Sequence, residues 1–408
     1  MRMDRFQMER TQCLYENDVR WNLSESGVQP LRVEELLDGE AGTRELLGLA
    51  LKYPESNGSR LLRERIALFY PGATADNVLV TTGCSEANYT TLWGLLEKTD
   101  RMAVMIPNYL QTWGLARGYG ARADAYRLVE KRRGLKRRWA LDVASLEKAV
   151  TPKTKAIMVT NPNNPTGAVL TEEEMGEIVR VAKKADAWIV SDEVYRGAEI
   201  GSDTPSPSFW GRYPKVIVTA GLSKAFGMPG LRIGWIVAPP KQAAALWAYQ
   251  DYTTLTPTML SDRLARTALE PRRREEILAR TRGILRAQLP PVEAWIRSHG
   301  ELFDYIPPVA GAIVLVKYRL PIRSAALFER LRLEKSVLIT PGAHFGIGRY
   351  VRIGYGYDIR KTLEGLSRVD ELLSELTGRR KAPPKGRSAS RVPAKRLLSE
   401  RGGPRASY

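Results

Sequence analysis

Between residues 78 and 238, short apolar runs alternate with helix-like segments, and this alternation constrains the fold more than any other feature. Helical periodicity is clear over 86–96 and 171–184. The strand-like runs are rich in β-branched residues and cover 78–82, 102–106, 156–160, 187–191, 216–220 and 233–238. Short strands that are apolar throughout and alternate with helices are typical of a mostly parallel, doubly wound sheet with helices on both faces. The sequence therefore predicts an α/β fold.

The remaining chain predicts a second, smaller unit. After a helical region over 243–297, further strands are expected near 311–316, 337–340 and 350–354, followed by a last helix over 359–376. We expect a large domain with the doubly wound sheet, a smaller α/β domain made by the C-terminal part together with the N-terminal segment, and a basic tail. The predicted boundaries are 1–50 for the N-terminal segment, 51–290 for the large domain, 291–378 for the small domain and 379–408 for the tail.

The formal charge of +18 suggests a nucleic-acid partner, but the positions of the basic residues in the chain argue against it. Residues 379–408 hold ten Lys or Arg against one Glu and are rich in Pro, Gly, Ser and Ala, which predicts a disordered tail. A second basic cluster, 131–138, predicts an exposed loop. Because no nucleic-acid-binding motif accompanies either cluster, solvated basic segments are favoured over a specific nucleic-acid site.

Composition excludes several other classes. The chain has two cysteines, Cys13 and Cys84, and two histidines, His299 and His344, which argues against a disulfide framework, a metal centre and a catalytic triad. No run approaches the roughly 18 apolar residues of a membrane span. The N-terminus is too polar for a signal peptide. We therefore expect a cytoplasmic protein with no metal and no membrane partner.

Polar and glycine residues follow nearly every predicted strand, at 81–85, 107–109, 161–167, 191–195 and 221–224. Ligands of doubly wound sheets bind beyond the carboxyl ends of the strands, so these loops are expected to form one pocket. Gly83-Cys84-Ser85 opens a helix whose free N–H groups suit a phosphate, and Arg232 adds a fixed charge. Lys224, on a tight turn, suits Schiff-base chemistry, in which a desolvated amine of lowered pKa attacks a carbonyl.

The other strand ends suit an aromatic cofactor that also carries a phosphate and an aldehyde. A buried Asp192 needs a cationic partner such as a protonated pyridine nitrogen, although a helix N-cap is an equally weighted role. Asn164 and Tyr195 can hydrogen-bond a phenolate oxygen of the ring. Tyr109 can stack on the ring face, although packing is the commoner role of such a tyrosine. Cys84 is expected to contribute its backbone, with a buried thiol.

Four motifs together carry a resemblance to a known family. They are Asn164-Pro165-Thr166-Gly167, Ser191-Asp192-Glu193-Val194-Tyr195, Ser223-Lys224 with Gly230-Leu231-Arg232-Ile233-Gly234, and Tyr350-Val351-Arg352-Ile353. In this order and spacing, the chain from about residue 23 to 376 resembles the pyridoxal-phosphate-dependent aminotransferases of class I/II. The resemblance implies the aspartate aminotransferase fold (fold type I), pyridoxal 5′-phosphate as cofactor, amino-acid and 2-oxo-acid substrates, and a homodimer that shares its sites.

The resemblance also implies a role for each matching residue. Lys224 would hold the cofactor as a Schiff base and move the substrate's α-proton. The implied catalytic residues are Lys224, Asp192 and Tyr195. The implied cofactor-binding residues are Gly83, Cys84, Ser85, Tyr109, Asn164, Asp192, Tyr195, Ser223, Lys224 and Arg232, together with Tyr53, which reaches the phosphate of the neighbouring subunit. The implied substrate-binding residues are Arg352, which clamps the α-carboxylate, Asn164 and Gly27.

Two positions depart from the family's pattern. Gly221 stands where many relatives have a phosphate-binding serine, so that contact is missing or comes from Ser223 or a backbone group. The N-terminal loop, 23–30, differs from the usual Leu-x-x-Gly-x-Pro. With residues 8–10, this edge is similar to a subgroup that includes capreomycidine synthase, which uses the same cofactor for elimination and cyclisation.

Three functions follow as hypotheses. The first is a ping-pong aminotransferase, and the second is a pyridoxal-phosphate enzyme of elimination, replacement or cyclisation. The third is a cofactor-binding regulatory protein, which would need a DNA-binding domain for which the 22 residues before Leu23 are too few. The sequence does not rank acidic, aromatic, aliphatic and basic amino acids as substrates.

Overall fold

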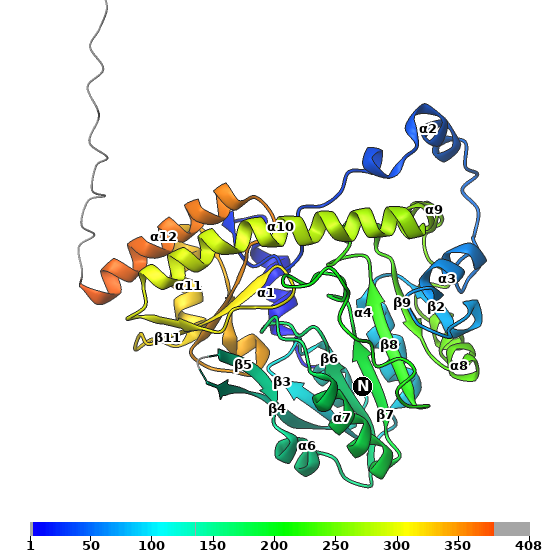
Figure 1. The fold of residues 1–408 in the computed structure, drawn as a ribbon, viewed down its shortest axis with the longest axis horizontal. Helices are drawn as coiled ribbons and strands as arrows, with labels where there is room; N and C mark the ends of the chain where they lie inside the picture. The colour runs from blue at the N-terminus through cyan, green and yellow to red at the C-terminus, as the bar shows by residue number, and fades with distance from the viewer. Residues whose placement is uncertain (1–2, 135, 379–408) are drawn as a thin grey trace, which may run out of the picture.

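An eight-stranded sheet forms the centre of the computed structural model, which describes residues 3–134 and 136–378 (Figure 1). Its order is β2-β9-β8-β7-β6-β3-β4-β5. The strands are β2 (Val78–Thr81), β3 (Arg101–Ile106), β4 (Arg122–Arg133), β5 (Lys136–Leu141), β6 (Thr154–Thr160), β7 (Trp188–Asp192), β8 (Val216–Gly221) and β9 (Gly234–Val237). Strands β4, β3, β6, β7 and β8 run parallel, while β9 runs antiparallel to β2 and β8, and β5 to β4. The predicted α/β fold with a mostly parallel sheet is confirmed.

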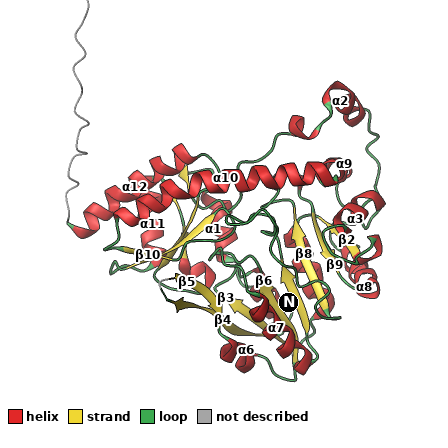
Figure 2. Ribbon diagram, in the orientation of Figure 1, coloured by secondary structure: helices red, strands yellow, loops and turns green. Residues whose placement is uncertain are grey.

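Helices cover both faces of this sheet (Figure 2). They are α3 (Arg60–Ala67), α4 (Cys84–Leu95), α5 (Gln111–Gly118), α6 (Val143–Ala149), α7 (Glu172–Ala185), α8 (Pro240–Gln250) and α9 (Met259–Ala268). Successive residues of β8 point to opposite faces of the sheet, and Val218 packs in one apolar core while Ile217 packs in a second, separate core, so both faces need to be covered. Helix α7 begins at a capping box in which Thr171 accepts from the N–H of Glu174.

A second, antiparallel sheet has the order β10-β11-β14-β13. Its strands are β10 (Phe303–Tyr305), β11 (Ile313–Tyr318), β13 (Thr340–Pro341) and β14 (Tyr350–Gly354), packed with α11 (Ser324–Lys335) and α12 (Ile359–Thr377). The 28-residue helix α10 (Pro271–Ser298) runs from α9 beside the large sheet to α12 (Figure 1). The domain boundary expected at residues 290 and 291 falls inside α10, and the division into domains stays a prediction.

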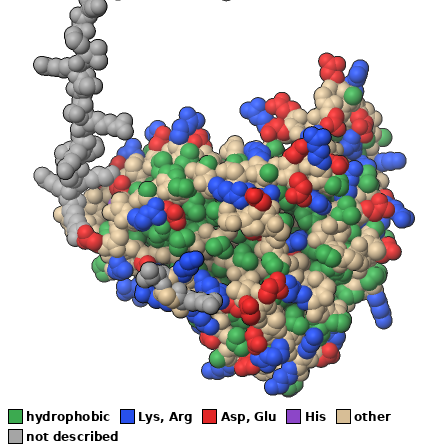
Figure 3. Space-filling view, in the orientation of Figure 1, with side chains coloured by type: hydrophobic (Ala, Val, Ile, Leu, Met, Phe, Trp, Pro, Cys, Tyr) green, Lys and Arg blue, Asp and Glu red, His purple; other side chains and the backbone are tan. Residues whose placement is uncertain are grey.

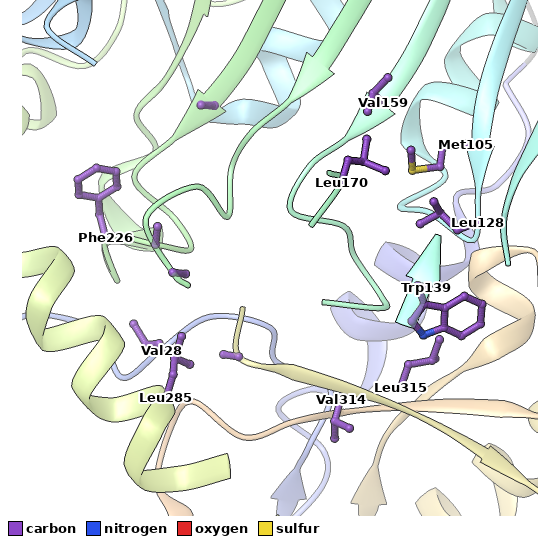
Figure 4. Close-up of a cluster of buried hydrophobic side chains, with 14 of the residues drawn as sticks. Val28, Met105, Leu128, Trp139, Val159, Leu170, Phe226, Leu285, Val314 and Leu315 are labelled. Carbon is purple, nitrogen blue, oxygen red and sulfur yellow. The ribbon is translucent and has the colours of Figure 1, made fainter. Parts of the chain in front are cut away.

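The two sheets share one apolar core. Figure 4 shows Leu315 of β11 close to Trp139 of β5, while Leu285 of α10 lies beside Val28 of the N-terminal segment. The loops between the two sheets are therefore fixed in position by apolar packing from both sides.

The N-terminal segment packs against the small sheet. It contains α1 (Gln7–Tyr15), β1 (Trp21–Asn22), the 3-10 helix η1 (Val33–Leu36) and α2 (Gly39–Leu47), which stands apart from the body in Figure 1. Strand β1 pairs in parallel with β12 (Val337–Leu338). The N–H of Gly354 on β14 then donates to the carbonyl of Leu23 at 2.8 Å. Residues 23–27 are thereby held across the end of the small sheet, next to Arg352. The remaining 3-10 helices are η2 (Ala75–Asn77), η3 (Pro229–Leu231) and η4 (Gly342–Phe345).

The basic cluster at 131–138 corrects one prediction. It was expected to be a loop, but most of it belongs to the β4–β5 hairpin, in which Leu128 lies opposite Leu141. Arg137 is held by Glu130 at 2.7 Å and Asp304 at 2.6 Å. These two acids neutralise part of the positive charge of the hairpin. The run of basic residues lacks the apolar pattern by which a strand is predicted from sequence, which explains the wrong prediction. Figure 3 shows Lys and Arg side chains near the hairpin, and acidic and basic side chains mixed over much of the remaining face.

Two further predictions concern the basic tail and membrane spans. The predicted basic tail, 379–408, lies outside the described residues. Within residues 3–134 and 136–378, no helix has the length and apolar character needed to cross a membrane.

Candidate active site

A cavity of about 290 Å³ lies beyond the carboxyl ends of β6, β7 and β8. Two walls with different origins enclose it. The sheet wall consists of Cys84, Ser85, Asn88, Thr160, Asp192, Ser223, Lys224 and Arg232. The N-terminal wall consists of Met8, Glu9, Gln12, Cys13, Glu16, Glu25 and Ser26. Tyr109, Asn164, Val194, Tyr195 and Pro229 complete the lining.

Most of the residues expected from the sequence meet at this cavity. Cys84, Ser85, Tyr109, Asn164, Asp192, Tyr195, Ser223, Lys224 and Arg232 all line it. Gly83 lies just behind the lining, next to Arg232. Gly27 turns its N–H toward Glu25, to whose Oε1 it donates at 2.9 Å. The loops that follow separate strands thus converge on one point, as the parallel sheet requires.

One end of the cavity is built to hold an anion. Gly83 has a φ of +81° and leads directly into the 12-residue helix α4, whose first N–H groups lack helical partners. A Cβ at Gly83 would lie 2.3 Å from Nη2 of Arg232, so glycine is required both for this backbone and for the approach of the guanidinium. Nη1 of Arg232 lies 3.4 Å from the hydroxyl of Ser223. A helix N-terminus, an arginine and a hydroxyl together suit a phosphate.

Close packing explains the departure at Gly221. A Cβ there would lie 2.9 Å from the carbonyl oxygen of Ile233 and 3.1 Å from Cα of Gly234. Both are backbone atoms, which cannot turn aside as a side chain can. A serine at this position would force β8 away from the chain that leads into β9, while Ser223 already brings a hydroxyl to the same end of the cavity.

Asp192 is a carboxylate fixed in position from three sides. It is 4% exposed, and its Oδ1 accepts from the N–H of Val194 at 3.1 Å and lies 3.7 Å from Sγ of Cys84. Its Oδ2 accepts from Nδ2 of Asn88 at 3.1 Å, and Asn88 in turn accepts from Thr219 at 2.7 Å. Burial raises the pKa of Asp192. A positively charged N–H in the cavity is the partner that this buried carboxylate lacks.

Asn88 was not predicted from the sequence as a site residue, although a signal was available. Residues four apart share one face of a helix, so the face of α4 that presents Cys84 to the cavity also presents Asn88.

The residues predicted to bind the ring have surroundings that suit an aromatic cofactor. Tyr195 is 3% exposed, and among the described residues its hydroxyl has no hydrogen-bond partner. A buried hydroxyl that lines a cavity without a partner points to a ligand. Asn164 lies on the same lining, where its Oδ1 accepts from Nη1 of Arg352 at 2.9 Å. With the anion-binding end and Asp192, these groups match the phosphate, the ring nitrogen and the ring oxygen of pyridoxal 5′-phosphate.

Lys224 has an unexpected partner. Its Nζ donates to Oε1 of Glu25 at 3.1 Å, and the same oxygen accepts from the N–H groups of Ser26 and Gly27 at 2.8 and 2.9 Å. The Lys224 ammonium lowers the pKa of Glu25 to about 2. Burial alone would lower the pKa of Lys224, but the charge of Glu25, the nearby Tyr195 and the hydrogen bond to Glu25 together raise it. The lowered pKa expected for this lysine is therefore wrong, because the sequence gives no sign that Glu25 reaches it.

Arg352 lies behind the cavity wall. It is fully buried, and its Nη2 donates to the carbonyl of Ser24 and, at 3.2 Å, to the hydroxyl of Thr340. Its Nη1 lies 4.0 Å from Sδ of Met8. In this arrangement the N-terminal segment covers the guanidinium that was expected to hold a substrate carboxylate.

Two tyrosines differ in their surroundings. Tyr53 is 81% exposed and contributes nothing to the cavity of its own chain. Tyr109 lines the cavity and donates to Oε1 of Glu9 at 2.9 Å, so its hydroxyl is tied to the N-terminal wall. Burial, followed by the Glu9 carboxylate, raises the pKa of Tyr109. Glu9 and Glu16 were not predicted as site residues, although their spacing of seven places them on one helix face.

Among residues 3–134 and 136–378, no cluster of His, Cys, Asp or Glu has the arrangement of a metal site.

Comparison with known proteins identifies the family. Residues 33–369 match the model of "Aminotransferase class I and II". Capreomycidine synthase of Streptomyces vinaceus is 28% identical over 377 residues, covering 89% of this chain and 92% of that protein. A pyridoxal-phosphate-dependent aminotransferase of Streptococcus suis has a similar structure, with a TM-score of 0.85 and 30% identity over 92% of this chain and 99% of that one. The pyridoxal-phosphate-dependent cyclase OrfR has a TM-score of 0.79 and 29% identity over 93% and 99% of the two chains. The chain therefore belongs to the class I and II aminotransferase family, with the aspartate aminotransferase fold, and is an enzyme that depends on pyridoxal 5′-phosphate.

Proposed function

We propose that the protein is a transaminase that moves an amino group between an amino acid and a 2-oxo acid in two half-reactions. The observation that carries the proposal is the convergence of Lys224, Asp192 and Tyr195 on one cavity, with an anion-binding end and an arginine behind it. The similarity to aminotransferases of the family extends over most of this chain, which supports the same activity.

Each residue has a task in this proposal. The N–H groups at the start of α4, Ser223 and Arg232 would bind the phosphate. Asp192 would keep a proton on the ring nitrogen, and Asn164 and Tyr195 would donate to the ring oxygen. Bound pyridoxal phosphate supplies an electron sink that stabilises negative charge at the substrate's Cα.

Proton movement falls to Lys224. Its Nζ would be the covalent attachment point. Once the substrate's amine has displaced it, this nitrogen would take the proton from the substrate's Cα and deliver it to C4′ of the cofactor. Arg352 would hold the substrate's carboxylate in a bidentate pair, with Asn164 and Gly27 beside it.

The contact between Glu25 and Lys224 favours a second candidate, which is elimination, replacement or cyclisation with the same cofactor. A carboxylate that raises the pKa of the amine keeps Lys224 in its protonated form, so this side chain is available as a general acid at neutral pH. Such an acid suits protonation of a leaving group or of a substrate carbon. The similarity to capreomycidine synthase and to the cyclase OrfR supports this candidate.

A single-turnover experiment separates the two. The cofactor-loaded protein is mixed with a panel of amino acids without any 2-oxo acid. Transamination predicts that the bound cofactor takes on the absorbance of its aminated form, with one equivalent of 2-oxo acid released. Release of ammonia, of a leaving group or of a cyclic product without the aminated form would replace the first candidate with the second.

We also propose a cytoplasmic homodimer, in which the exposed Tyr53 reaches the phosphate site of the neighbouring subunit. If so, Tyr53→Phe should weaken cofactor binding, and Lys224→Ala subunits should restore it in mixed dimers by supplying their intact Tyr53 to the sites of Tyr53→Phe subunits. Cofactor binding that is unchanged in Tyr53→Phe would contradict the shared site.

A further inference from the structure

Asn88 is a buried polar residue of the cavity wall to which the proposed function gives no task. It lies one helical turn after Cys84 on α4 and lines the cavity, although it is only 1% exposed. Leu92 and Leu95 share its face of the helix and pack in an apolar core. Because burying an amide is costly unless the amide is hydrogen-bonded, the contacts of Asn88 must explain why an asparagine stands on this face.

The amide of Asn88 has a partner on each side. Its Nδ2 donates to Oδ2 of Asp192 at 3.1 Å and to Oε1 of Gln111 at 3.2 Å. Its Oδ1 accepts from the hydroxyl of Thr219 at 2.7 Å. Gln111 donates in turn from Nε2 to the carbonyl of Ser85 at 3.0 Å, so the oxygen of Gln111 faces Asn88 and needs a donor there. These contacts fix the amide with its NH2 group toward the carboxylate.

This orientation of the amide favours an ionised Asp192. Hydrogen bonds donated to a carboxylate stabilise its charged form, whereas burial favours its neutral form. Burial raises the pKa of Asp192, and the hydrogen bond from Asn88 is the largest of the contacts that oppose this effect. A reversed amide would turn its oxygen toward the carboxylate, and only a protonated Asp192 could bond to it. Gln111 disfavours that reversal, because its own oxygen would then face the oxygen of Asn88.

Helix α4 therefore serves the site at two points. Its first N–H groups belong to the anion-binding end of the cavity. One turn later, Asn88 holds the carboxylate that is expected at the ring nitrogen. The same short stretch of helix thus sets the positions of both groups.

We propose that Asn88 is a positioning residue that keeps Asp192 ionised and aimed into the cavity, so that the ring nitrogen of the bound cofactor stays protonated. Thr219 and Gln111 hold its amide in the required orientation. The inference rests on the role of Asp192 in the proposed function. It holds for either candidate reaction, because both use the protonated ring as an electron sink.

The test compares two cofactors that differ only at the ring nitrogen. They are pyridoxal 5′-phosphate and 1-deazapyridoxal 5′-phosphate, in which a C–H group replaces the nitrogen. Dissociation constants of both are measured by titration of the cofactor-free protein, and their ratio gives the preference for the nitrogen. Asn88→Leu keeps a similar volume but removes the N–H donors, so it should reduce this preference about tenfold.

Two further variants support the comparison. Thr219→Val removes only the hydroxyl that holds the Asn88 amide, and it should reduce the preference about threefold. If Asn88→Leu does not fold, Thr219→Val provides the same test with the asparagine in place. Thr91→Val is the matched control, because the hydroxyl of Thr91 is buried on the same helix and has no partner among the described residues, so the preference should stay unchanged.

A second measurement follows the proton itself. The chemical shift of the ring nitrogen is recorded against pH in protein loaded with 15N-labelled pyridoxal phosphate. We expect the nitrogen to lose its proton at a lower pH in Asn88→Leu than in the unmodified protein, because Asp192 then stabilises the positive charge less well. A residue that only supported the fold would not move this titration.

The outcomes separate this inference from the function beneath it. Equal weakening of both cofactors by Asn88→Leu, with an unchanged titration of the nitrogen, would overturn the inference and leave the role of Asp192 standing. Asp192→Asn is the reference, because it should abolish the preference whatever Asn88 does. If Asp192→Asn keeps the full preference, the proposed place of Asp192 at the ring nitrogen is wrong, and the inference is wrong with it.

Discussion

The sheet wall and the N-terminal wall enclose the same cavity but are held in place by different means. Asp192 ends a strand whose last four residues are buried, and Asn88 and the backbone of Val194 fix its carboxylate. The N-terminal wall depends on the two-residue pairing of β1 with β12 and on the hydrogen bonds of Gln12. The sheet wall presents both signs of charge, whereas the ionisable groups of the N-terminal wall are three carboxylates and the Cys13 thiol.

This difference suggests a division of labour. Cofactor chemistry needs atoms held rigidly, and the ends of buried strands provide that. Substrate selectivity needs a surface whose residues can differ between related enzymes without disturbing the cofactor site. The N-terminal wall, which comes from a separate segment of the chain, can provide such a surface. The predictions below test whether the two walls can be altered independently.

The largest effect is expected at the centre of the sheet wall. Lys224→Ala should reduce turnover by at least about a thousandfold, since it removes both the covalent attachment and the proton carrier. Borohydride reduction followed by mass spectrometry checks the attachment directly. The unmodified protein and the exposed-lysine control Lys241→Ala should both gain the mass of the cofactor. A variant without Lys224 that still gains this mass at a single site would show that the attachment point is elsewhere.

A smaller loss is expected for the carboxylate at the ring nitrogen. Asp192→Asn should lower turnover about a hundredfold, because a preorganised charge at a reacting system contributes about this much. Amino-acid binding, which we propose depends on Arg352 rather than on Asp192, should change far less. The control Asp203→Asn removes an exposed aspartate far from the lining and should have no effect. A loss in Asp192→Asn that lies entirely in amino-acid affinity would erase the distinction between the walls.

His344, which lies near Arg352 behind the N-terminal wall, is expected to make the stability of the protein depend on pH. Burial, with the Arg352 guanidinium nearby, lowers the pKa of His344 to about 4, so the folded protein keeps this ring neutral where the unfolded chain protonates it. The stabilisation is complete above pH 6.5 and is lost as the pH falls toward 4. Between pH 7 and pH 5, the free energy of unfolding of the unmodified protein should fall by up to about 2 kcal/mol more than that of His344→Asn.

Denaturant unfolding at several pH values measures this difference. Parallel curves for the two proteins would mean that His344 titrates normally. The result would then argue that the region beside Arg352 is open to water.

The smallest effect is expected where the two walls touch. Glu25→Gln removes the carboxylate that raises the pKa of Lys224, so at pH 7 more of the amine is neutral and able to attack. Cofactor-free protein should therefore capture pyridoxal phosphate faster than the unmodified protein does. Stopped-flow absorbance gives the rate, and Glu34→Gln, on the exposed face of η1, is the control. An equal or slower rate would mean that Glu25 does not control the proton on Lys224.

The two walls also differ in how far the sequence predicted them. Asp192, Lys224 and Arg232 follow apolar strands or sit in glycine turns, and such local patterns reveal both the strand and its end. Their family motifs are short and continuous. The strand pattern of the β4–β5 hairpin was hidden by charge, so residues 131–138 were wrongly predicted as a loop.

The N-terminal wall was harder to predict for a physical reason. Glu25 lies in the loop 23–30, which departs from the family's pattern, yet its contact with Lys224 joins residues 199 positions apart. Only the three-dimensional path of residues 20–27 over the small sheet brings them together. Glu9 and Glu16 likewise line the cavity only because α1 lies over it.

The pairing of β1 with β12 has a consequence for how the protein is made. Arg20 donates from its backbone to Ser336, across a separation of 316 residues. The partners of residues 20–29 extend to Gly356, so they are synthesised long after every strand of the large sheet. Contacts this distant in sequence form late in folding. A nascent chain therefore holds every strand of the large sheet before the partners of β1 have been made, so we expect the N-terminal wall to be the last part of the site to be completed.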